Sequence, residues 1–170
     1  MLNSDEIRIS GVIEESIVDG TGIRYVIFTQ GCPHHCTGCH NPATHDFDGG
    51  KVVSTQKLIS EIKENPLISG VTFSGGEPFC QPKPLIKIAQ EVIKLGKSIW
   101  AFSGYTFEEL LDMGEDVKKL LSLCDVLVDG EFIMEEKSLS LKFRGSKNQR
   151  LVDVKKSLLE GKRSIIIVLL

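Results

Sequence analysis

The sequence predicts an α/β fold, and three features of the chain support this prediction. Short β-rich runs alternate with longer segments of helical periodicity, which is the pattern of βαβ units in a parallel sheet. The 170 residues fit one domain, 1–170, and are too few for eight βα units, which take about 250 residues. Residues 7–18 form a further β-rich run that precedes the alternation. We therefore expect an incomplete βα barrel: a curved, mostly parallel sheet of about five strands, helices on its outer face and an N-terminal β addition.

The first half of the chain supplies two strands and two helices of this series. Residues 25–29 (YVIFT) and 71–74 (VTFS) are rich in β-branched and aromatic residues and predict strands. Between them, apolar residues at helical spacing predict a helix that starts near Ser54 and stops before Pro66. The same spacing predicts a second helix from a Pro-rich entry at Pro82, with Gly96 as the residue that ends it.

The second half continues the alternation. Residues 98–102 predict a strand, and Thr106 and Glu109 have the capping-box spacing that starts a helix. Because Gly114 interrupts the apolar face of that helix, we expect the helix to bend or split there. Two further β-rich runs lie at 126–128 and 165–169.

Composition excludes several classes of protein. The chain is 41% hydrophobic and 25% charged, as in ordinary globular proteins, and has a formal net charge of −3. Its Lys and Arg residues are scattered, so we expect no nucleic-acid partner. The longest apolar run, 165–170, is far shorter than the roughly 18 residues that cross a bilayer, and no secretory leader is visible. We expect a cytoplasmic protein with no membrane partner.

Three of the five cysteines lie close together. Cys32, Cys36 and Cys39 have C-x3-C-x2-C spacing directly after a predicted strand. An odd number of cysteines in a cytosolic chain argues against a disulfide framework and favours a metal site or reactive thiols. Cubane clusters usually take four Cys ligands, so a [4Fe–4S] cluster held by three leaves one iron free to bind a small molecule.

The cysteine spacing alone leaves two other readings open. A plain electron-transfer cluster is one, and a structural zinc site completed by a histidine is the other. Zinc sites commonly use two separated pairs of ligands, and no second Cys pair follows, which favours the three-thiol cluster. Cys80 and Cys124 stand alone, and we expect ordinary buried thiols there. The histidines that could complete a zinc site are His34, His35, His40 and His45.

A glycine-rich segment, Ser74-Gly-Gly-Glu-Pro78, follows the second predicted strand. Open α/β sheets bind ligands at this end of their strands, and Gly75 and Gly76 let the backbone approach a ligand closely. Glu77 is a candidate partner for an ammonium group. The segment taken alone is also compatible with a tight turn before a helix.

The cysteine loop and the GGEP segment, in this order, resemble the radical S-adenosylmethionine (SAM) superfamily. The resemblance implies that Cys32, Cys36 and Cys39 hold a [4Fe–4S] cluster whose fourth iron is chelated by SAM. It further implies reductive cleavage of SAM to methionine and a 5′-deoxyadenosyl radical. The residue before the third cysteine is often aromatic in that superfamily but is Gly38 here, so its side chain cannot stack on adenine. The SAM contacts that the resemblance implies are Gly38, Cys39, His40, Asn41, Gly75, Gly76 and Glu77.

Two further SAM contacts are predicted from strand position. Ser103 and Asp129 each follow a predicted parallel strand and should lie near the edge that carries the cluster. Each also has a plain structural reading, because Ser103-Gly104 could be a loop before a capped helix and Asp129-Gly130 is a common turn dipeptide.

Additional segments resemble the activating proteins of glycyl radical enzymes, in particular those of anaerobic ribonucleoside-triphosphate reductases. The resemblance implies that the large subunit of such a reductase is the partner, with an electron donor such as reduced flavodoxin. Arg144, Asn148 and Arg150 are rich in hydrogen-bond donors and are predicted to shape the docking surface. The alternatives are an activase of the pyruvate formate-lyase type, a radical SAM enzyme acting on a small molecule, and a non-catalytic zinc or iron–sulfur module. The segments that carry the resemblance are 19–24, 103–106, 128–130 and 144–150.

Overall fold

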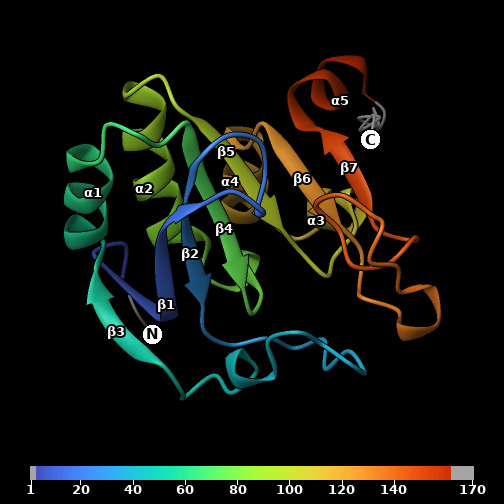
Figure 1. Cartoon of the computed structure of the whole chain (residues 1–170). Coiled ribbons are helices and arrows are strands. Elements are labelled where there is room, and N and C mark those ends of the chain that lie inside the picture. Colours follow the sequence, from blue (N-terminus) through green and yellow to red (C-terminus); the bar gives the residue numbers. More distant parts are fainter. Residues whose placement is uncertain (1–2, 162–170) are drawn as a thin grey trace.

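A computed structural model describes residues 3–161 of the chain, and in it seven strands form one open sheet. Their order across the sheet is β3-β1-β2-β4-β5-β6-β7 (Figure 1). The strands are β1 (Glu6–Ser16), β2 (Arg24–Thr29), β3 (Lys51–Ser54), β4 (Gly70–Gly75), β5 (Ser98–Phe102), β6 (Val126–Asp129) and β7 (Arg150–Asp153).

The centre of the sheet is parallel and its edges are antiparallel. Strands β2, β4, β5 and β6 pair in parallel, as the βα alternation predicts. Strand β1 pairs antiparallel with β2, which confirms the N-terminal β addition. The expected count of about five strands was too low, because β3 and β7 add two short antiparallel edges that their four-residue runs do not reveal.

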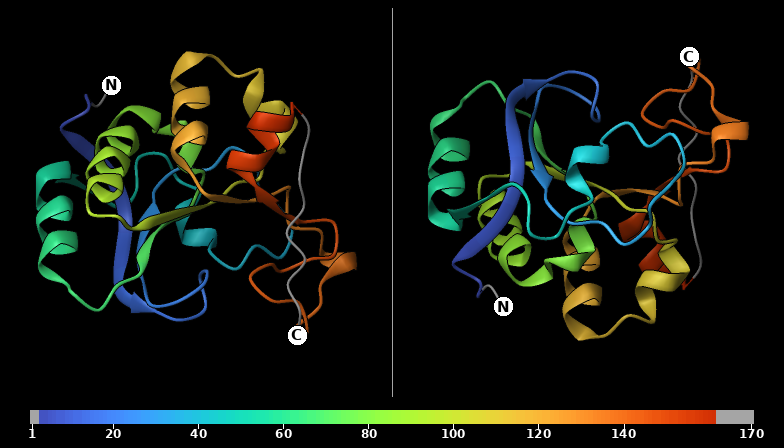
Figure 2. Two further views of the ribbon diagram at one scale, coloured as in Figure 1. Left: turned by 90° about the horizontal axis from the view of Figure 1, so that it is seen from above. Right: turned by 90° about the horizontal axis from the view of Figure 1, so that it is seen from below.

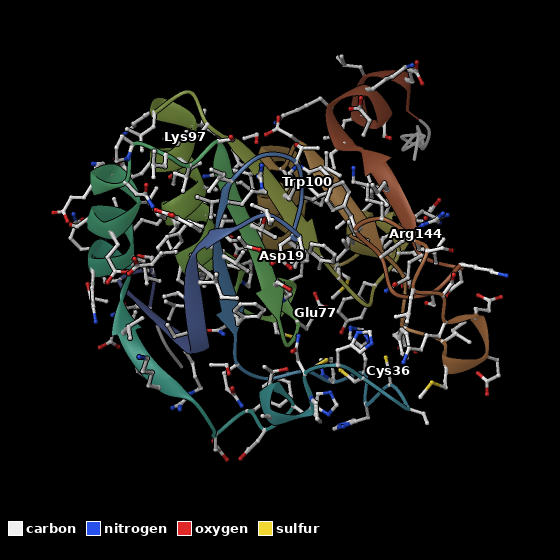
Figure 3. All side chains as sticks on the ribbon, in the orientation of Figure 1. Asp19, Cys36, Glu77, Lys97, Trp100 and Arg144 are labelled. Atoms are coloured by element: carbon white, nitrogen blue, oxygen red, sulfur yellow. The ribbon has the colours of Figure 1, made fainter. Side chains whose placement is uncertain are left out.

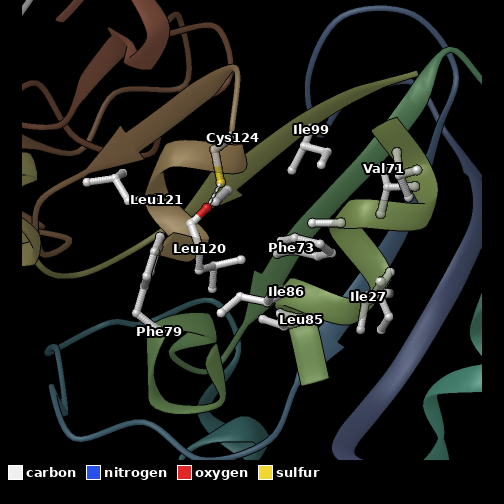
Figure 4. Close-up of a cluster of buried hydrophobic side chains, with 14 of the residues drawn as sticks. Ile27, Val71, Phe73, Phe79, Leu85, Ile86, Ile99, Leu120, Leu121 and Cys124 are labelled. Atoms are coloured by element: carbon white, nitrogen blue, oxygen red, sulfur yellow. Dashed lines mark hydrogen bonds between the residues drawn. The ribbon is translucent and has the colours of Figure 1, made fainter. Parts of the chain in front are cut away.

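Within the described residues, five helices accompany the sheet, and in Figure 2 they lie on one side of it. Side chains alternate along each strand, so that Ile27, Phe73 and Ile99 face the helices and join the main core (Figure 4). A smaller apolar cluster around Trp100 and Val128 covers part of the opposite face. The helices are α1 (Thr55–Glu64), α2 (Pro82–Lys94), α3 (Phe107–Leu111), α4 (Glu115–Leu123) and α5 (Val154–Glu160), and short 3-10 turns are η1 (Pro42–Thr44), η2 (Pro78–Cys80) and η3 (Met134–Glu136).

The helix boundaries follow local chemistry that the sequence displays. Ser54 caps α1 by accepting a hydrogen bond from the Gln56 backbone, and the capping box of Thr106 and Glu109 starts α3. The expected split occurs at Gly114, whose φ of 99° separates α3 from α4. Helix α5 was not predicted, and the β-rich run at 165–169 lies outside the described residues. None of the helices in the described part of the chain has the length and apolarity to span a membrane.

Candidate iron–sulfur and cofactor site

A cavity of about 640 Å³ opens at the carboxyl ends of β2, β4, β5 and β6, where the sequence predicts the site. The loop after β2 runs beneath the ends of these strands toward the segment between β6 and β7 (Figure 1). Figure 3 labels Glu77 and Cys36 at this end of the sheet, and labels Arg144 to the side, near β7. Of the predicted site residues, those lining the cavity are Cys32, Cys36, Cys39, His40, Asn41, Gly75, Gly76, Ser103 and Arg144.

The three clustered cysteines all line this cavity. Burial raises the pKa of Cys32, and burial likewise raises that of Cys36, where a backbone hydrogen bond from Phe132 opposes the rise. Since only thiolates bind metal, cluster binding must deprotonate both side chains. Within residues 3–161, no three His, Cys, Asp or Glu side chains are arranged as ligands of a single metal ion. A cubane places its thiolates on different irons, so this arrangement is compatible with a cluster.

A second observation fits a bound group. His45 is one of the residues that line the same cavity, and its Nε2 atom is buried without a hydrogen-bond partner. Buried polar atoms normally have a partner, so a group that the chain does not supply is expected nearby. Three thiols and an unpaired imidazole nitrogen in one cavity fit a [4Fe–4S] cluster.

The two glycines of the GGEP segment have packing reasons to be glycine. Gly75 has a φ of 98°, and a Cβ there would lie 2.5 Å from the Thr29 backbone. A Cβ on Gly76 would lie 2.4 Å from the carbonyl oxygen of Gly31, directly before Cys32. The Glu77 backbone N–H also donates to the Gly31 carbonyl at 2.8 Å. The GGEP segment therefore lies in direct contact with the start of the cysteine loop.

Glu77 is fully buried, and protein donors surround its carboxylate. Ser103 Oγ donates at 2.9 Å, the Gly104 backbone at 2.9 Å and the Phe79 backbone at 3.1 Å. His34 Nε2 lies 2.8 Å from the same carboxylate. Because these donors already bind its oxygens, the structure favours a structural role for Glu77, and its contact with the SAM ammonium group stays a prediction. Glu77 joins the ends of β4 and β5 to the cysteine loop.

His34 was considered only as a zinc ligand, and the structure gives it another position. Its ring lies between Glu77 and Glu131, 3.0 Å from the latter, and contacts Tyr105 edge to face. Burial lowers the pKa of His34, but hydrogen bonds and charge attraction from the two glutamates outweigh it, so the pKa is raised. Nothing in the cysteine spacing signals this contact, because Glu131 is 97 residues away.

Asp129 is not among the residues that line the main cavity, and its contact with SAM stays a prediction. Asp129 follows Val128 on β6, and since side chains alternate, Val128 lines the cavity while Asp129 lies on the helix-covered face with Leu127. Its carboxylate accepts from the Phe107 backbone at 2.7 Å and pairs with Arg150. Asp129 lines a neighbouring cavity of about 400 Å³ and binds the first residue of α3 and the first residue of β7. Ser103 does line the main cavity.

The basic segment near the C-terminus is mostly bonded within the chain rather than free for docking. Arg150 binds the carboxylates of Asp129 and Glu108. Asn148 donates to the Glu131 backbone at 2.7 Å. Arg144 donates to the backbone carbonyls of Lys147 and Gln149 but also lines the cavity. The ion pairs of Arg150 with Asp129 and Glu108 favour a structural role for this side chain, and its role in docking stays a prediction.

The sequence did not predict which residues surround Gly38. Gly38 does not line the cavity, and a Cβ there would lie 2.1 Å from the end of the Met134 side chain. Phe132 lines the cavity and its ring centre lies 5.1 Å from that of His40. The segment after β6 thus packs on the cysteine loop, a long-range contact that no local pattern predicts.

The two isolated cysteines lie outside this cavity. Cys124 is fully buried and its thiol donates to the Leu120 carbonyl, as expected of an ordinary buried thiol. Cys80 is exposed, so the expectation that it is buried was wrong. Its position at the end of η2 leaves the residue at the surface beside α2.

Comparison with known proteins agrees with the donor set. The family described as a 4Fe-4S single cluster domain matches residues 18–152, most of the chain. The fold and site thus define an iron–sulfur protein that carries a [4Fe–4S] cluster.

Comparison with curated relatives identifies a more specific family. The anaerobic ribonucleoside-triphosphate reductase-activating protein of Vibrio cholerae is 37% identical over 78% of this chain and 89% of its own length. Its namesake in Escherichia coli K12 is 33% identical over 78% and 90%, and that of phage T4 is 34% identical over 79% and 86%. The chain belongs to this family of reductase-activating proteins. Among solved structures, Escherichia coli QueE aligns with a TM-score of 0.49 and 15% identity over 73% of this chain and 70% of its own.

Proposed function

We propose that this chain is a radical SAM oxidoreductase that generates a glycyl radical on an anaerobic ribonucleoside-triphosphate reductase. One observation carries the proposal: the three cysteines and the GGEP glycines line the same cavity, in a chain that belongs to the reductase-activating family. When bound, the cluster and SAM supply one-electron cleavage of the sulfonium to methionine and a 5′-deoxyadenosyl radical, which takes a hydrogen atom from glycine.

The chain's own residues position and shield this chemistry. Cys32, Cys36 and Cys39 would hold the cluster, and the cavity that they line has room for a bound cofactor. The backbone around Gly75 and Gly76 is the proposed contact for the amino acid part of SAM, since it has no side chains to block approach. Glu77 acts indirectly by fixing Ser103 and His34. The remaining proposed SAM contacts are Gly38, Cys39, His40, Asn41 and Ser103.

The proposed substrate is a glycine in a protein loop, which needs a wide entrance. The β1–β2 connection lines the cavity with Ile17 and Val18, which are 74% and 70% exposed. Exposed aliphatic side chains beside a cavity suit a polypeptide partner. We propose that the sheet is a partial βα barrel whose lateral opening admits this loop from the reductase large subunit. An electron donor such as reduced flavodoxin would act in the cytoplasm.

The test is anaerobic reconstitution with iron and sulfide, followed by mixing with reductant, SAM and candidate partners. We expect a coloured iron–sulfur protein and a glycyl radical signal in electron paramagnetic resonance with the anaerobic reductase. A glycyl radical that forms only on a pyruvate formate-lyase type enzyme would mean that this enzyme, and not the reductase, is the partner. If 5′-deoxyadenosine is released with a metabolite but with neither partner protein, the substrate is a small molecule and not a glycine of a protein. A colourless protein that retains zinc would refute the proposal.

A further inference from the structure

His45 is attached to the cysteine loop by its backbone. It follows the short turn η1, and its carbonyl accepts a hydrogen bond from the Cys32 backbone at 3.1 Å. His45 is among the residues that line the cavity, as are Cys32 and Cys39. The position of His45 is therefore fixed relative to the first cluster ligand.

The ring nitrogen Nε2 of His45 is buried and has no hydrogen-bond partner. Among the described residues, the other buried side-chain atom without a partner is Glu136 Oε2, which does not line this cavity. An unpaired buried nitrogen costs free energy comparable to a lost hydrogen bond. Since the cavity is the proposed place of the cluster, the missing partner is expected to be part of that cluster.

The other histidines near the cysteines have different surroundings. His34 Nε2 lies against Glu77 and its Nδ1 against Glu131. His35 is exposed and does not line the cavity, although its ring contacts that of His45 edge to face. His40 lines the cavity but packs on Phe132. Of these four histidines, His45 alone combines a cavity position with a buried, unpaired nitrogen.

We propose that His45 donates a hydrogen bond from Nε2–H to a sulfur of the [4Fe–4S] cluster and thereby raises its reduction potential. Cluster sulfurs accept hydrogen bonds, and such bonds tune the potential. The reduced cluster carries one more negative charge than the oxidised cluster, so the donor stabilises the reduced state more. His45 is thus a positioning and tuning residue that touches the cluster without ligating iron. The inference rests on the proposed function only for the presence of the cluster.

The test compares midpoint potentials of reconstituted full-length protein without SAM or partner. His45→Phe keeps a ring but removes the donor, His45→Gln keeps an N–H, and His35→Phe is the matched control on the exposed neighbour. We expect His45→Phe to disfavour reduction about tenfold, which is about 59 mV downward for one electron. His45→Gln should recover part of this shift, and His35→Phe should keep the wild-type potential.

Three outcomes would overturn the proposal. Wild-type potential in His45→Phe means that no such bond exists, and an equal shift in His35→Phe means that the effect is general to the loop. Loss of iron from folded His45→Phe and His45→Gln means that His45 is a ligand instead. If His45→Phe does not fold, His45→Leu takes its place. The potential is measured whether or not a glycyl radical forms, so failure of the proposed partner leaves this result interpretable.

Discussion

His34 Nε2 lies 2.8 Å from a carboxylate oxygen of Glu77, and this contact joins the cysteine loop to the GGEP segment. Glu77 is completely buried and the His34 side chain is 7% exposed. A buried carboxylate needs hydrogen-bond donors, and His34 supplies one from between two cluster cysteines. The loop proposed to hold the cluster and the loop proposed to bind SAM are therefore joined by a direct contact.

This contact predicts a pH-dependent stability. Because the folded-state pKa of His34 is raised, protonated His34 stabilises the fold fully below its unfolded pKa of about 6.5, and the contribution is lost as pH rises through the folded value. In cluster-free protein, His34→Gln should lower the melting temperature more at pH 5.5 than at pH 8.5. His35→Gln, at an exposed neighbour, is the control. A deficit in His34→Gln that grows with pH would contradict the assignment.

Replacement of single cysteines should separate ligands from bystanders. Cys32→Ala, Cys36→Ala and Cys39→Ala should each lose the cluster, because a cubane with two protein thiolates has lost a third of its anchors. Cys80→Ala and Cys124→Ala should retain it. Cys124 is buried, so its variant should also lose about 1 kcal/mol of stability through the cavity left behind. Iron content and visible absorption measure whether each variant holds the cluster. A wild-type iron content in any of the first three variants would contradict the proposed ligands.

The glycine at position 76 should matter for the cluster as well as for SAM. An added Cβ would lie 2.4 Å from the Gly31 carbonyl, so Gly76→Ala should displace the start of the cysteine loop. From sequence alone, a larger side chain at Gly76 is expected to impair SAM binding and spare the cluster. The structure changes that expectation to a loss of both. Gly11→Ala is the control, because a Cβ there meets nothing within 4 Å. Full cluster content with weak SAM binding in Gly76→Ala would mean that Gly76 matters for SAM binding and not for the cluster.

The predictable parts of the fold are those fixed by local chemistry. The alternating runs that became β2, β4, β5 and β6 predict the parallel core, and Thr106 and Glu109 predict the start of α3. The edges β3 and β7 have only four residues each, and their pairing depends on distant strands. Such short segments acquire strand geometry from tertiary contacts rather than from their own pattern.

The same division holds for the site. Cysteine spacing and the GGEP motif predict which residues meet in the cavity, because the carboxyl ends of parallel strands share one edge. Two carboxylates that the sequence predicts as SAM contacts do not line the cavity, for distinct reasons. Asp129 is turned away by strand alternation, and Glu77 is enclosed by donors from the cysteine loop, from the loop after β5 and from its own turn η2. The contacts of Phe132 with the cysteine loop lie beyond any local pattern, because the segment after β6 is irregular.

The basic segment allows a division between structural and functional roles. Arg150 pairs with buried Asp129 through two nitrogens and also reaches Glu108. Arg150→Ala would leave the Asp129 carboxylate buried without its partner, which costs about 3 kcal/mol. Thermal unfolding should show this loss, and Arg150→Ala should lower SAM cleavage and glycyl radical formation together because less protein is folded.

Arg144→Ala should behave differently. Arg144 lines the cavity and bonds only to backbone carbonyls among its described hydrogen-bond partners, so its loss leaves no buried charge unpaired. We expect a folded protein with its cluster, in which glycyl radical formation on the reductase falls by more than uncoupled release of 5′-deoxyadenosine. Both products are measured on the same preparation, after normalisation to iron content. If the two activities fall equally in Arg144→Ala, this residue belongs to SAM binding, and the partner must be recognised elsewhere on the cavity rim.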